Sequence, residues 1–217
     1  MAVLQVRKTK TLGVLNPIPF GVTIFNCIAW LMYGCQKRDY FLFFSNCSGL
    51  IFGFFYCLSV IPHIPEGDET TPDKKYMKLI VEVLVMGSVV FWATIALFVF
   101  IVMDPSKLTD VKIGQTIVSS FGVIGGLSYY GSPLSSMHSV IKLKDSSSLH
   151  TPMILTNLAA AFLWFIYGLV GVPDVMIWIP NMLGCMLSLS QLTLSFMYHP
   201  LTLKVTLTFP YPYSLSG

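Results

Sequence analysis

The alternation of apolar and polar stretches divides the chain into six long apolar runs joined by short polar segments. Each run holds roughly 18 or more residues, which is the length an α-helix needs to cross the hydrocarbon core of a bilayer. The pattern predicts six transmembrane helices, over residues 17–34, 40–61, 78–103, 112–138, 152–171 and 175–198. Hydrophobic residues make up 54% of the chain and charged residues only 11%. A soluble domain carries about 25% charged residues, so the composition predicts an all-α membrane protein with no added soluble domain.

Two stretches of the chain carry the same order of residue types. NPIPFGVTIFNCIAWLMYG starts at Asn16, and HTPMILTNLAAAFLWFIYG starts at His150. Each has a proline near the start of its apolar run and a tryptophan three residues before a Tyr-Gly pair. A polar loop follows, and then a second apolar run with an asparagine and a glycine, in FFSNCSG and in WIPNMLG. A duplicated helix pair with matched polar residues is typical of a transporter whose site lies between two repeats.

Basic residues flank the predicted spans unevenly. With six spans, one face of the membrane receives the N-terminus, the segment after 61, the loop after 138 and the tail. That face carries nine basic residues: Arg7, Lys8, Lys10, Lys74, Lys75, Lys78, Lys142, Lys144 and Lys204. The other face carries four: Lys37, Arg38, Lys107 and Lys112. The face with more Lys and Arg is expected to be cytoplasmic, which predicts a cytoplasmic C-terminus.

The titratable residues narrow the class of function. No Asp or Glu lies deep in a predicted span, whereas proton- or sodium-coupled transporters typically use such a group. Facilitated diffusion of a neutral solute is therefore favoured. No Ser-His-Asp or Cys-His set can be assembled from the motifs, so an enzyme is not predicted. The five cysteines lack metal-ligand spacing, and no basic stripe with aromatic residues indicates nucleic acid, so neither cofactor nor metal nor nucleic acid is expected.

The two copies of the repeat are unequal in length. Pro133 precedes Pro152 by nineteen residues, and the same count back from Pro19 falls just ahead of Met1. We therefore expect the first copy to lack its first helix, with the chain truncated at the N-terminus. A complete version would have three helices, a linking helix over 78–103 and three further helices.

Five motifs follow one another over about residues 5–200: PF…NC..W..YG, SN.SG, SPL..M..V, TP…W..YG and IPN..G…..QL. In this order they resemble the SWEET family of sugar uniporters. The resemblance implies two parallel three-helix-bundle repeats joined by a linker helix, here with six spans because the first helix is absent. The implied parts are an incomplete first repeat of two helices (1–61), a cytoplasmic linker (62–77), a linker helix (78–103), a second three-helix repeat (104–198) and a cytoplasmic tail (199–217).

Four residues in matched positions are candidates for substrate binding. Asn46 and Asn181 lie within apolar spans, where a buried amide must find a polar partner. Two amides that face one cavity suit sugar hydroxyls, and both match sugar-binding asparagines of the family; hydrogen bonding between helices is the alternative interpretation. Trp30 and Trp164 offer indole faces that can stack on a sugar ring, and otherwise are aromatic residues of the membrane interface. Trp164 matches a pocket tryptophan of the family, and a second tryptophan should narrow the cavity toward monosaccharides.

Gating residues follow from the resemblance. Tyr33 and Asp174, at the non-cytoplasmic ends of their spans, match residues that close the outer gate by hydrogen bonding. The alternative is an interfacial tyrosine and an exposed loop aspartate. Pro19, Pro133 and Pro152 match three helix prolines of the family, which are expected to let the helices bend at the inner gate. For Pro19 and Pro152 the alternative is a place in the first turn of a helix.

The sequence thus predicts bidirectional facilitated transport of mono- or small oligosaccharides, glucose-like or sucrose-like, by alternating access. One alternative is a related PQ-loop-type transporter of small solutes, although Leu134 rather than glutamine follows Pro133. Another is a non-transporting fragment or assembly partner. The plasma membrane is the expected location, with the Golgi or vacuole as alternatives. We expect a homo-oligomer in the lipid bilayer, because a repeat that lacks a helix leaves pocket surface uncovered.

Overall fold

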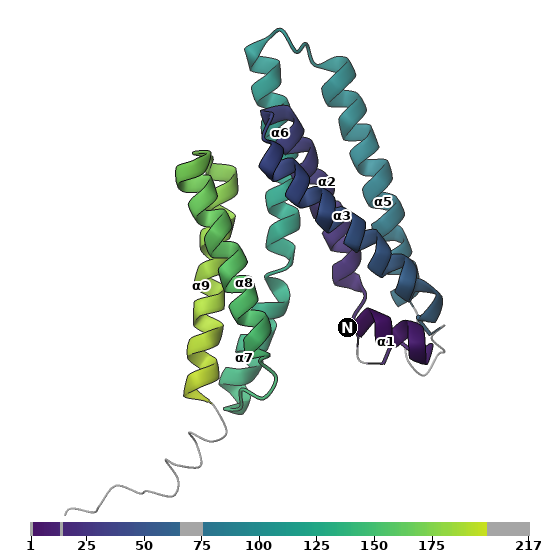
Figure 1. The fold of residues 1–217 in the computed structure, drawn as a ribbon, viewed down its shortest axis with the longest axis vertical. Helices are drawn as coiled ribbons and strands as arrows, with labels where there is room; N and C mark the ends of the chain where they lie inside the picture. Colours follow the sequence, from purple (N-terminus) through teal and green to yellow (C-terminus); the bar gives the residue numbers. More distant parts are fainter. Residues whose placement is uncertain (1, 14, 66–75, 199–217) are drawn as a thin grey trace, which may run out of the picture. The chain divides into compact units, whose positions relative to one another are not determined.

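The computed structural model describes residues 2–13, 15–65 and 76–198, and helices are the regular structure found over them (Figure 1). The long helices are α2 (Ile18–Lys37), α3 (Tyr40–Val60), α5 (Met77–Leu97), α6 (Leu108–Ser128), α8 (Thr151–Ile166) and α9 (Val175–Met197). The shorter ones are α1 (Ala2–Thr9), the 3₁₀ turn η1 (Ile61–His63), α7 (Gly131–Leu143) and the π-helical turns η2 (Phe98–Val102) and η3 (Tyr167–Gly171). The predicted tail and most of the predicted linker lie outside the described residues.

Five stretches of the described chain are long and apolar enough to cross a bilayer. They are Ile18–Lys37, Tyr40–His63, Met77–Val102, Thr151–Gly171 and Val175–Met197. Each coincides with a predicted apolar run to within about three residues at either end.

The sixth predicted run, 112–138, is not one helix but two, α6 and α7, separated at Tyr129 and Tyr130. Pro133 lacks a backbone N–H, and its ring would clash with a carbonyl one turn earlier, so a helix cannot pass through it undisturbed. Helix α6 closes with a hydrogen bond from Tyr130 N to the carbonyl of Leu127 (3.0 Å), and α7 opens with Leu134 N donating to Tyr130 O (3.0 Å).

The chain forms two compact units, Met1–Gly126 and Leu127–Gly217. The boundary falls in the last turn of α6, immediately before the break at Tyr129. The first unit holds α1, α2, α3, α5 and most of α6, and the second holds α7, α8 and α9.

An aromatic cluster fastens α5 and α6 to α2 in the first unit. The buried Trp92 of α5 donates its indole N–H to the carbonyl of Phe25 in α2 at 3.0 Å. Phe25 and Trp92 lie 5.2 Å apart between ring centroids, and Phe91 meets Phe121 of α6 at 4.9 Å. Lipid is as apolar as these rings, so close van der Waals packing and the indole hydrogen bond, rather than exclusion from water, account for the association.

The second unit repeats the local structure of the first, with α7, α8 and α9 in the places of α1, α2 and α3. Lys10 after α1 and Lys144 after α7 both adopt the left-handed conformation, with φ of 58° and 54°. Asp39 and Asp174 are the N-caps of α3 and α9, and each accepts a hydrogen bond at 3.0 Å from a backbone N–H in the first turn. The sequence repeat therefore extends upstream to the short helix α1.

Glycine at the end of each repeat's second helix allows the third helix to approach to backbone contact. A Cβ on Gly34 would lie 2.9 Å from the backbone N of Phe43, and one on Gly168 would lie 2.8 Å from that of Trp178. Real Cβ atoms do not tolerate these distances, and a backbone atom cannot rotate away. These two glycines are thus required by the tight turns between α2 and α3 and between α8 and α9.

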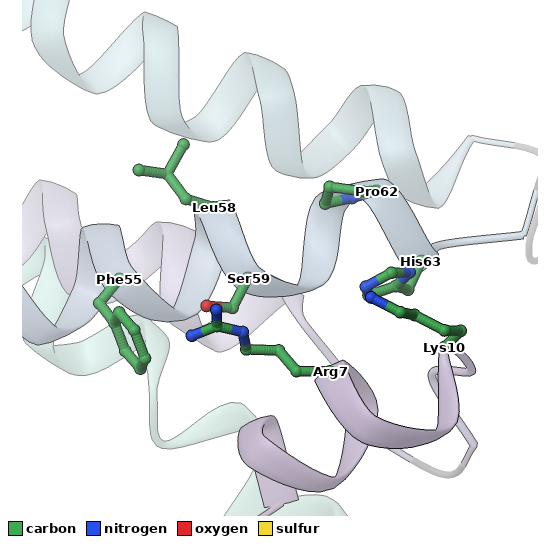
Figure 2. Close-up of a pocket in the computed structure, with 7 residues that line it drawn as sticks. All are labelled: Arg7, Lys10, Phe55, Leu58, Ser59, Pro62 and His63. Carbon is green, nitrogen blue, oxygen red and sulfur yellow. The ribbon is translucent and has the colours of Figure 1, made fainter.

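Helix α1 forms where the sequence pattern indicates only a polar, basic segment. Val3 and Val6, one turn apart, are buried in a core with Cys57 and Val60 of α3. The basic residues of α1 lie on its other side, and Figure 2 shows Arg7 extending along α3, with its guanidinium carbon 5.8 Å from the centroid of the Phe55 ring. Two valines were too few to reveal an apolar stripe in an eight-residue helix.

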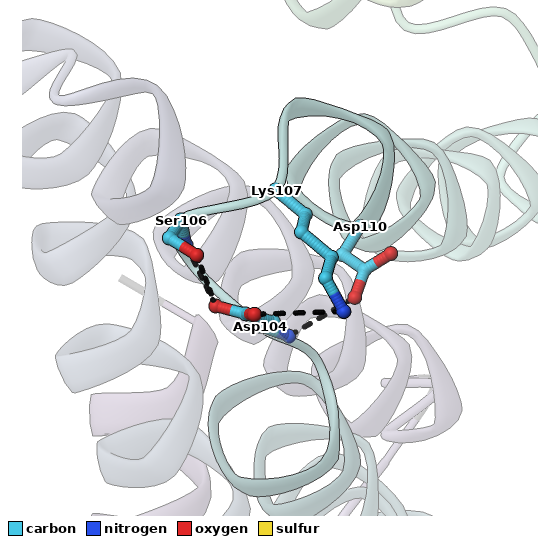
Figure 3. Close-up of polar contacts among 4 residues, drawn as sticks. All are labelled: Asp104, Ser106, Lys107 and Asp110. Carbon is cyan, nitrogen blue, oxygen red and sulfur yellow. Dashed lines mark hydrogen bonds and ion pairs between the residues drawn. The ribbon is translucent and has the colours of Figure 1, made fainter.

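The loop between η2 and α6 is closed by its own polar groups (Figure 3). Asp104 accepts hydrogen bonds from the backbone N (3.0 Å) and hydroxyl (2.7 Å) of Ser106, and its own N–H donates to Asp110 at 3.1 Å. The hydrogen bonds from Ser106 lower the pKa of the Asp104 carboxyl. Lys107 lies 3.6 Å from the same carboxylate. These contacts fix the turn that leads the chain from α5 and η2 into α6.

Replacing either turn glycine by alanine should destabilise the protein. Gly34→Ala and Gly168→Ala force a methyl group against backbone, and overpacking of this kind costs about 1–3 kcal/mol. Gly87→Ala on α5 is the matched control, because no heavy atom lies within 4 Å of its Cβ position. Alanine is favoured over glycine there by about 0.5–1 kcal/mol. Thermal unfolding of the purified proteins in detergent measures the difference, and equal melting temperatures for all three variants would contradict the packing described.

Candidate functional site

Asn46 and Asn181 have the same local environment in the two repeats. Each lies seven residues after the N-cap aspartate of its helix. The side-chain nitrogen of Asn46 donates to the carbonyl of Leu42 at 2.8 Å, and that of Asn181 donates to Ile177 at 2.7 Å. In each asparagine this hydrogen bond uses one of the two amide N–H groups and fixes the side chain against its own helix. One N–H and the amide oxygen of each residue make no further hydrogen bond within the described part of the chain, so both amides can bind a ligand hydroxyl.

The tryptophan and the asparagine of each repeat lie at the same depth along their helix pair. A Cβ on Gly49 of α3 would lie 2.7 Å from the sulfur of Cys27 in α2, which marks where the two antiparallel helices cross. Trp30 follows Cys27 by three residues and Asn46 precedes Gly49 by three. Both therefore lie about 4.5 Å from the crossing, toward the same end of the pair.

The second repeat has the same arrangement. A Cβ on Gly184 of α9 would lie 3.3 Å from that of Ala161 in α8. Trp164 and Asn181 again stand three residues from this crossing on the same side. Each repeat thus offers one indole and one amide at matching heights, a pair suited to the apolar face and the hydroxyl edge of a sugar.

Each tryptophan is held by the tyrosine one turn later. The rings of Trp30 and Tyr33 meet edge to face, with centroids 5.9 Å apart, and those of Trp164 and Tyr167 do so at 5.6 Å. Both tryptophans are half-buried. Trp30 also packs on α6, where its ring lies 3.1 Å from the Cβ position of Gly122. The indoles are therefore positioned by packing before any ligand arrives.

The predicted gate residues lie in different units, Tyr33 in the first and Asp174 in the second. Tyr33 is 3% exposed and Asp174 is 8% exposed. Asp174 caps α9, so it is not the exposed loop aspartate that was the alternative interpretation. The repeat also places Tyr167 and Asp39 in the equivalent positions. The sequence predicted no gating role for these two, although a spacing of 134 residues relates Tyr167 to Tyr33 and one of 135 relates Asp174 to Asp39.

The three predicted hinge prolines lie at the beginnings of helices. Pro19 and Pro152 are the second residues of α2 and α8, and Pro133 is the third residue of α7. The first four N–H groups of a helix have no partner within that helix, so proline costs no hydrogen bond there. Bending at these points would therefore occur where helices meet loops. Pro180, which was not singled out, lies inside α9.

Tyr130 connects the break between α6 and α7 to α9. Its hydroxyl donates to the carbonyl of Pro180, the residue before Asn181. It also fits over Gly184, where a Cβ would lie 2.9 Å from the hydroxyl oxygen. A side chain at the break thus contacts α9 on both sides of the candidate amide.

Asn26 is a further polar group of the first unit. Its amide oxygen is buried and has no hydrogen-bond partner in the part of the chain that the structure describes. It faces α6, 3.2 Å from the Cβ position of Gly125 and one turn before Trp30. An unpaired amide oxygen in a bilayer is costly, which makes this a site where a partner is needed.

Comparison with known proteins places these features in a family. A family profile described as a sugar efflux transporter for intercellular exchange matches residues 1–63 and 116–202. The chain is 27% identical over 192 residues to the sugar transporter SWEET1 of Caenorhabditis elegans, covering 88% of this chain and 56% of that protein. It is 28% identical to SWEET1 of Drosophila pseudoobscura pseudoobscura, covering 88% and 77%. It is also 28% identical to the bidirectional sugar transporter SWEET11 of Arabidopsis thaliana, covering 89% and 62%. The chain thus spans little more than half of the nematode relative.

The fold agrees with a solved structure. A eukaryotic SWEET transporter superposes with a TM-score of 0.73 at 22% identity, covering 90% of this chain and 85% of that one. The predicted all-α membrane fold is thereby confirmed. With five helices able to span a bilayer among the described residues, the chain is an integral, multi-pass membrane protein.

Removing the hydroxyl of Tyr130 should loosen α9 around the candidate amide. Tyr130→Phe loses the bond to Pro180, and a hydrogen bond of this kind contributes about 0.5–1.5 kcal/mol. We expect a lower melting temperature and faster amide hydrogen exchange in α9. The control is Tyr40→Phe, because Tyr40 is 72% exposed. Unchanged exchange in α9 would show that the contact does not hold this helix.

Proposed function

Because this chain belongs to the family of sugar efflux transporters for intercellular exchange, we propose that it carries sugars across a membrane in both directions by facilitated uniport. The family is one of transporters and not of enzymes. The observation that supports the proposal most directly is the matched pair of half-sites, Asn46 with Trp30 and Asn181 with Trp164. Each amide is fixed by its own helix and keeps donor and acceptor capacity for a hydroxyl.

The substrate is proposed to bind between the two half-sites, near the middle of the membrane. Hydroxyls of the sugar would bond to the two amides, and the C–H faces of the ring would stack on the two indoles. An all-neutral set of ligands suits an uncharged sugar, because a carboxylate or amine would be buried without a counter-charge.

Alternating access is proposed to open the site to one side at a time. Tyr33, near the end of α2, and Asp174, the N-cap of α9, would form the outer gate by hydrogen bonding. At the other end, Pro19, Pro133 and Pro152 would let the helices swing at their first turns. No acidic residue lies deep in a span, which supports movement down a concentration gradient without ion coupling.

The orientation in the membrane, the location and the assembly are also proposed. The excess of basic residues on the flanks of one face supports a cytoplasmic C-terminus, with the plasma membrane as the proposed location. The many exposed apolar side chains of α3, such as Phe44 at 64% and Ile51 at 68%, suit contact with lipid or with a second copy. A homo-oligomer in the bilayer is the proposed assembly.

Uptake of labelled glucose in cells that lack hexose transporters tests the assignment. We expect uptake that equilibrates without accumulation and is unaffected by a protonophore. Asn46→Ala and Asn181→Ala should each lower uptake roughly tenfold, as expected for a hydrogen bond worth about 1.4 kcal/mol. Ser48→Ala and Ser190→Ala are matched controls, since each serine bonds to its own helix from an exposed position of α3 or α9. Membrane-inserted protein without uptake would refute glucose transport and favour a non-transporting assembly partner.

The size of the transported sugar should depend on Trp30. We expect Trp30→Ser to widen the cavity, so that a disaccharide such as sucrose competes better with glucose than it does in the unchanged protein. The measurement is inhibition of glucose uptake by a panel of mono- and disaccharides. Phe162→Ser is the control, because Phe162 of α8 is 53% exposed. If the sugars inhibit glucose uptake in the same order in Trp30→Ser as in the unchanged protein, Trp30 does not limit the size of the substrate.

A further inference from the structure

An open pocket lies away from the half-sites, between α1 and the last turns of α3 with η1 (Figure 2). Its volume is about 350 Å³, which falls at the small end of the range for ligand sites. Helix α1 supplies one wall through Arg7, and the other wall belongs to α3. The pocket is therefore built by the contact of two elements within the first unit and not by a loop alone.

Three basic side chains converge on this pocket. Arg7 lies beside Ser59, and Lys10 extends toward the ring of His63, as Figure 2 shows. Within the described residues, no carboxylate lies within ion-pair distance of any of the three. The two cations, Arg7 and Lys10, are thus gathered without a counter-charge from the described part of the chain.

The rest of the lining is apolar and continues onto the outer surface of α3. Phe55, Leu58 and Pro62 line the pocket. Phe55 is 39% exposed and Leu58 is 69% exposed, on a helix that is apolar enough to span the bilayer. A ligand with its charge among the basic groups would therefore have its remainder beside hydrocarbon.

At the equivalent position of the second repeat, the lysine is paired within the protein and an apolar residue replaces the second cation. Lys144, the equivalent of Lys10, donates to the hydroxyl of Tyr198 at 2.9 Å and lies 4.8 Å from the centre of its ring. Tyr198 stands 24 residues after the N-cap of α9, as His63 does after that of α3. Ile141 occupies the position of Arg7. The lysine of the second repeat therefore has an internal partner, whereas the first repeat has a second cation and an open pocket.

We propose that this pocket binds the headgroup of an anionic phospholipid. Arg7 and Lys10 would hold the phosphate, Ser59 and His63 would donate hydrogen bonds, and Phe55 and Leu58 would contact the start of an acyl chain. Basic pockets between membrane helices recognise acidic headgroups in this way, and anionic lipids are concentrated in the cytoplasmic leaflet. The location fits, because this end of α3 lies on the face richest in basic residues. The lipid would fasten α1 to α3 at the membrane surface.

Native mass spectrometry of the purified full chain tests the proposal. Dioctanoyl phosphatidylglycerol is the anionic probe, and dioctanoyl phosphatidylcholine is the neutral one. We expect one phosphatidylglycerol to bind at least tenfold more tightly than phosphatidylcholine. The double variant Arg7→Gln, Lys10→Gln should abolish that preference, and His63→Gln should weaken it. Lys8→Gln is the matched control, because Lys8 is an exposed residue of α1 that does not line the pocket.

Two further arms identify the source of the phosphate. Leu58→Gln should weaken binding of phosphatidylglycerol, because its acyl chain loses an apolar contact. Glycerol 3-phosphate and inorganic phosphate should compete only at far higher concentrations than the lipid. Equal potency of the soluble phosphates would overturn the lipid assignment in favour of a soluble anion. An equal loss of lipid in Lys8→Gln would overturn the site itself. Neither readout depends on sugar transport, so failure here is separate from failure of the proposed function.

Discussion

In each half of the chain, a glycine at the end of one helix lets the next helix approach to backbone contact. The rest of the fold depends on this approach. With Gly34 against Phe43 and Gly168 against Trp178, the two helices of a pair leave their turn already in contact. They then cross at a second small residue, Gly49 or Gly184. No hydrophobic driving force joins helices in lipid, so such contact between small residues is what holds each pair. The same crossing sets the heights of the amide and the indole, which makes the geometry of the site a consequence of the packing.

Polar groups inside the bilayer are satisfied within their own helix wherever they can be. Asn46 and Asn181 each donate to a carbonyl one turn earlier, and Ser88, Thr94 and Ser119 do the same on α5 and α6. Such bonds leave helices free to move past one another, because no bond between helices has to break. Asn26 departs from this rule, since its amide oxygen is buried without a partner among the described residues. Trp92 is a second exception, because it donates its hydrogen bond to another helix. The bond to the Phe25 carbonyl joins α5 to α2. The contrast separates the indole contact, which holds α5 against α2, from a buried amide oxygen whose partner is still to be identified.

Much of the architecture could be predicted from sequence because a bilayer demands uniform stretches about twenty residues long. The five long apolar helices and the internal repeat followed from that demand and from the spacing of Trp, Tyr, Asn and Gly. Other features depend on single contacts that no pattern reveals. Helix α1 forms because Val3 and Val6 reach the core of α3, and the run over 112–138 divides because Pro133 cannot continue it. The depth shared by Trp30 and Asn46 required the crossing of Cys27 and Gly49, which is a property of the folded pair. How the two half-sites act on one ligand remains a prediction that follows from the repeat.

The two repeats differ in the residue that comes immediately before the candidate asparagine. In α3 the residue before Asn46 is Ser45, which keeps its backbone N–H and also bonds to the carbonyl of Phe41. In α9 the residue before Asn181 is Pro180, so that helix lacks one bond, and Tyr130 attaches to the proline's carbonyl from outside. Asn46 therefore stands on a continuous helix and Asn181 on an interrupted one. If a sugar binds both amides as proposed, the interrupted helix has more conformational freedom to lose, so the larger part of the entropic cost is expected there. Any adjustment of the two amides to a ligand is therefore expected in α9 rather than in α3.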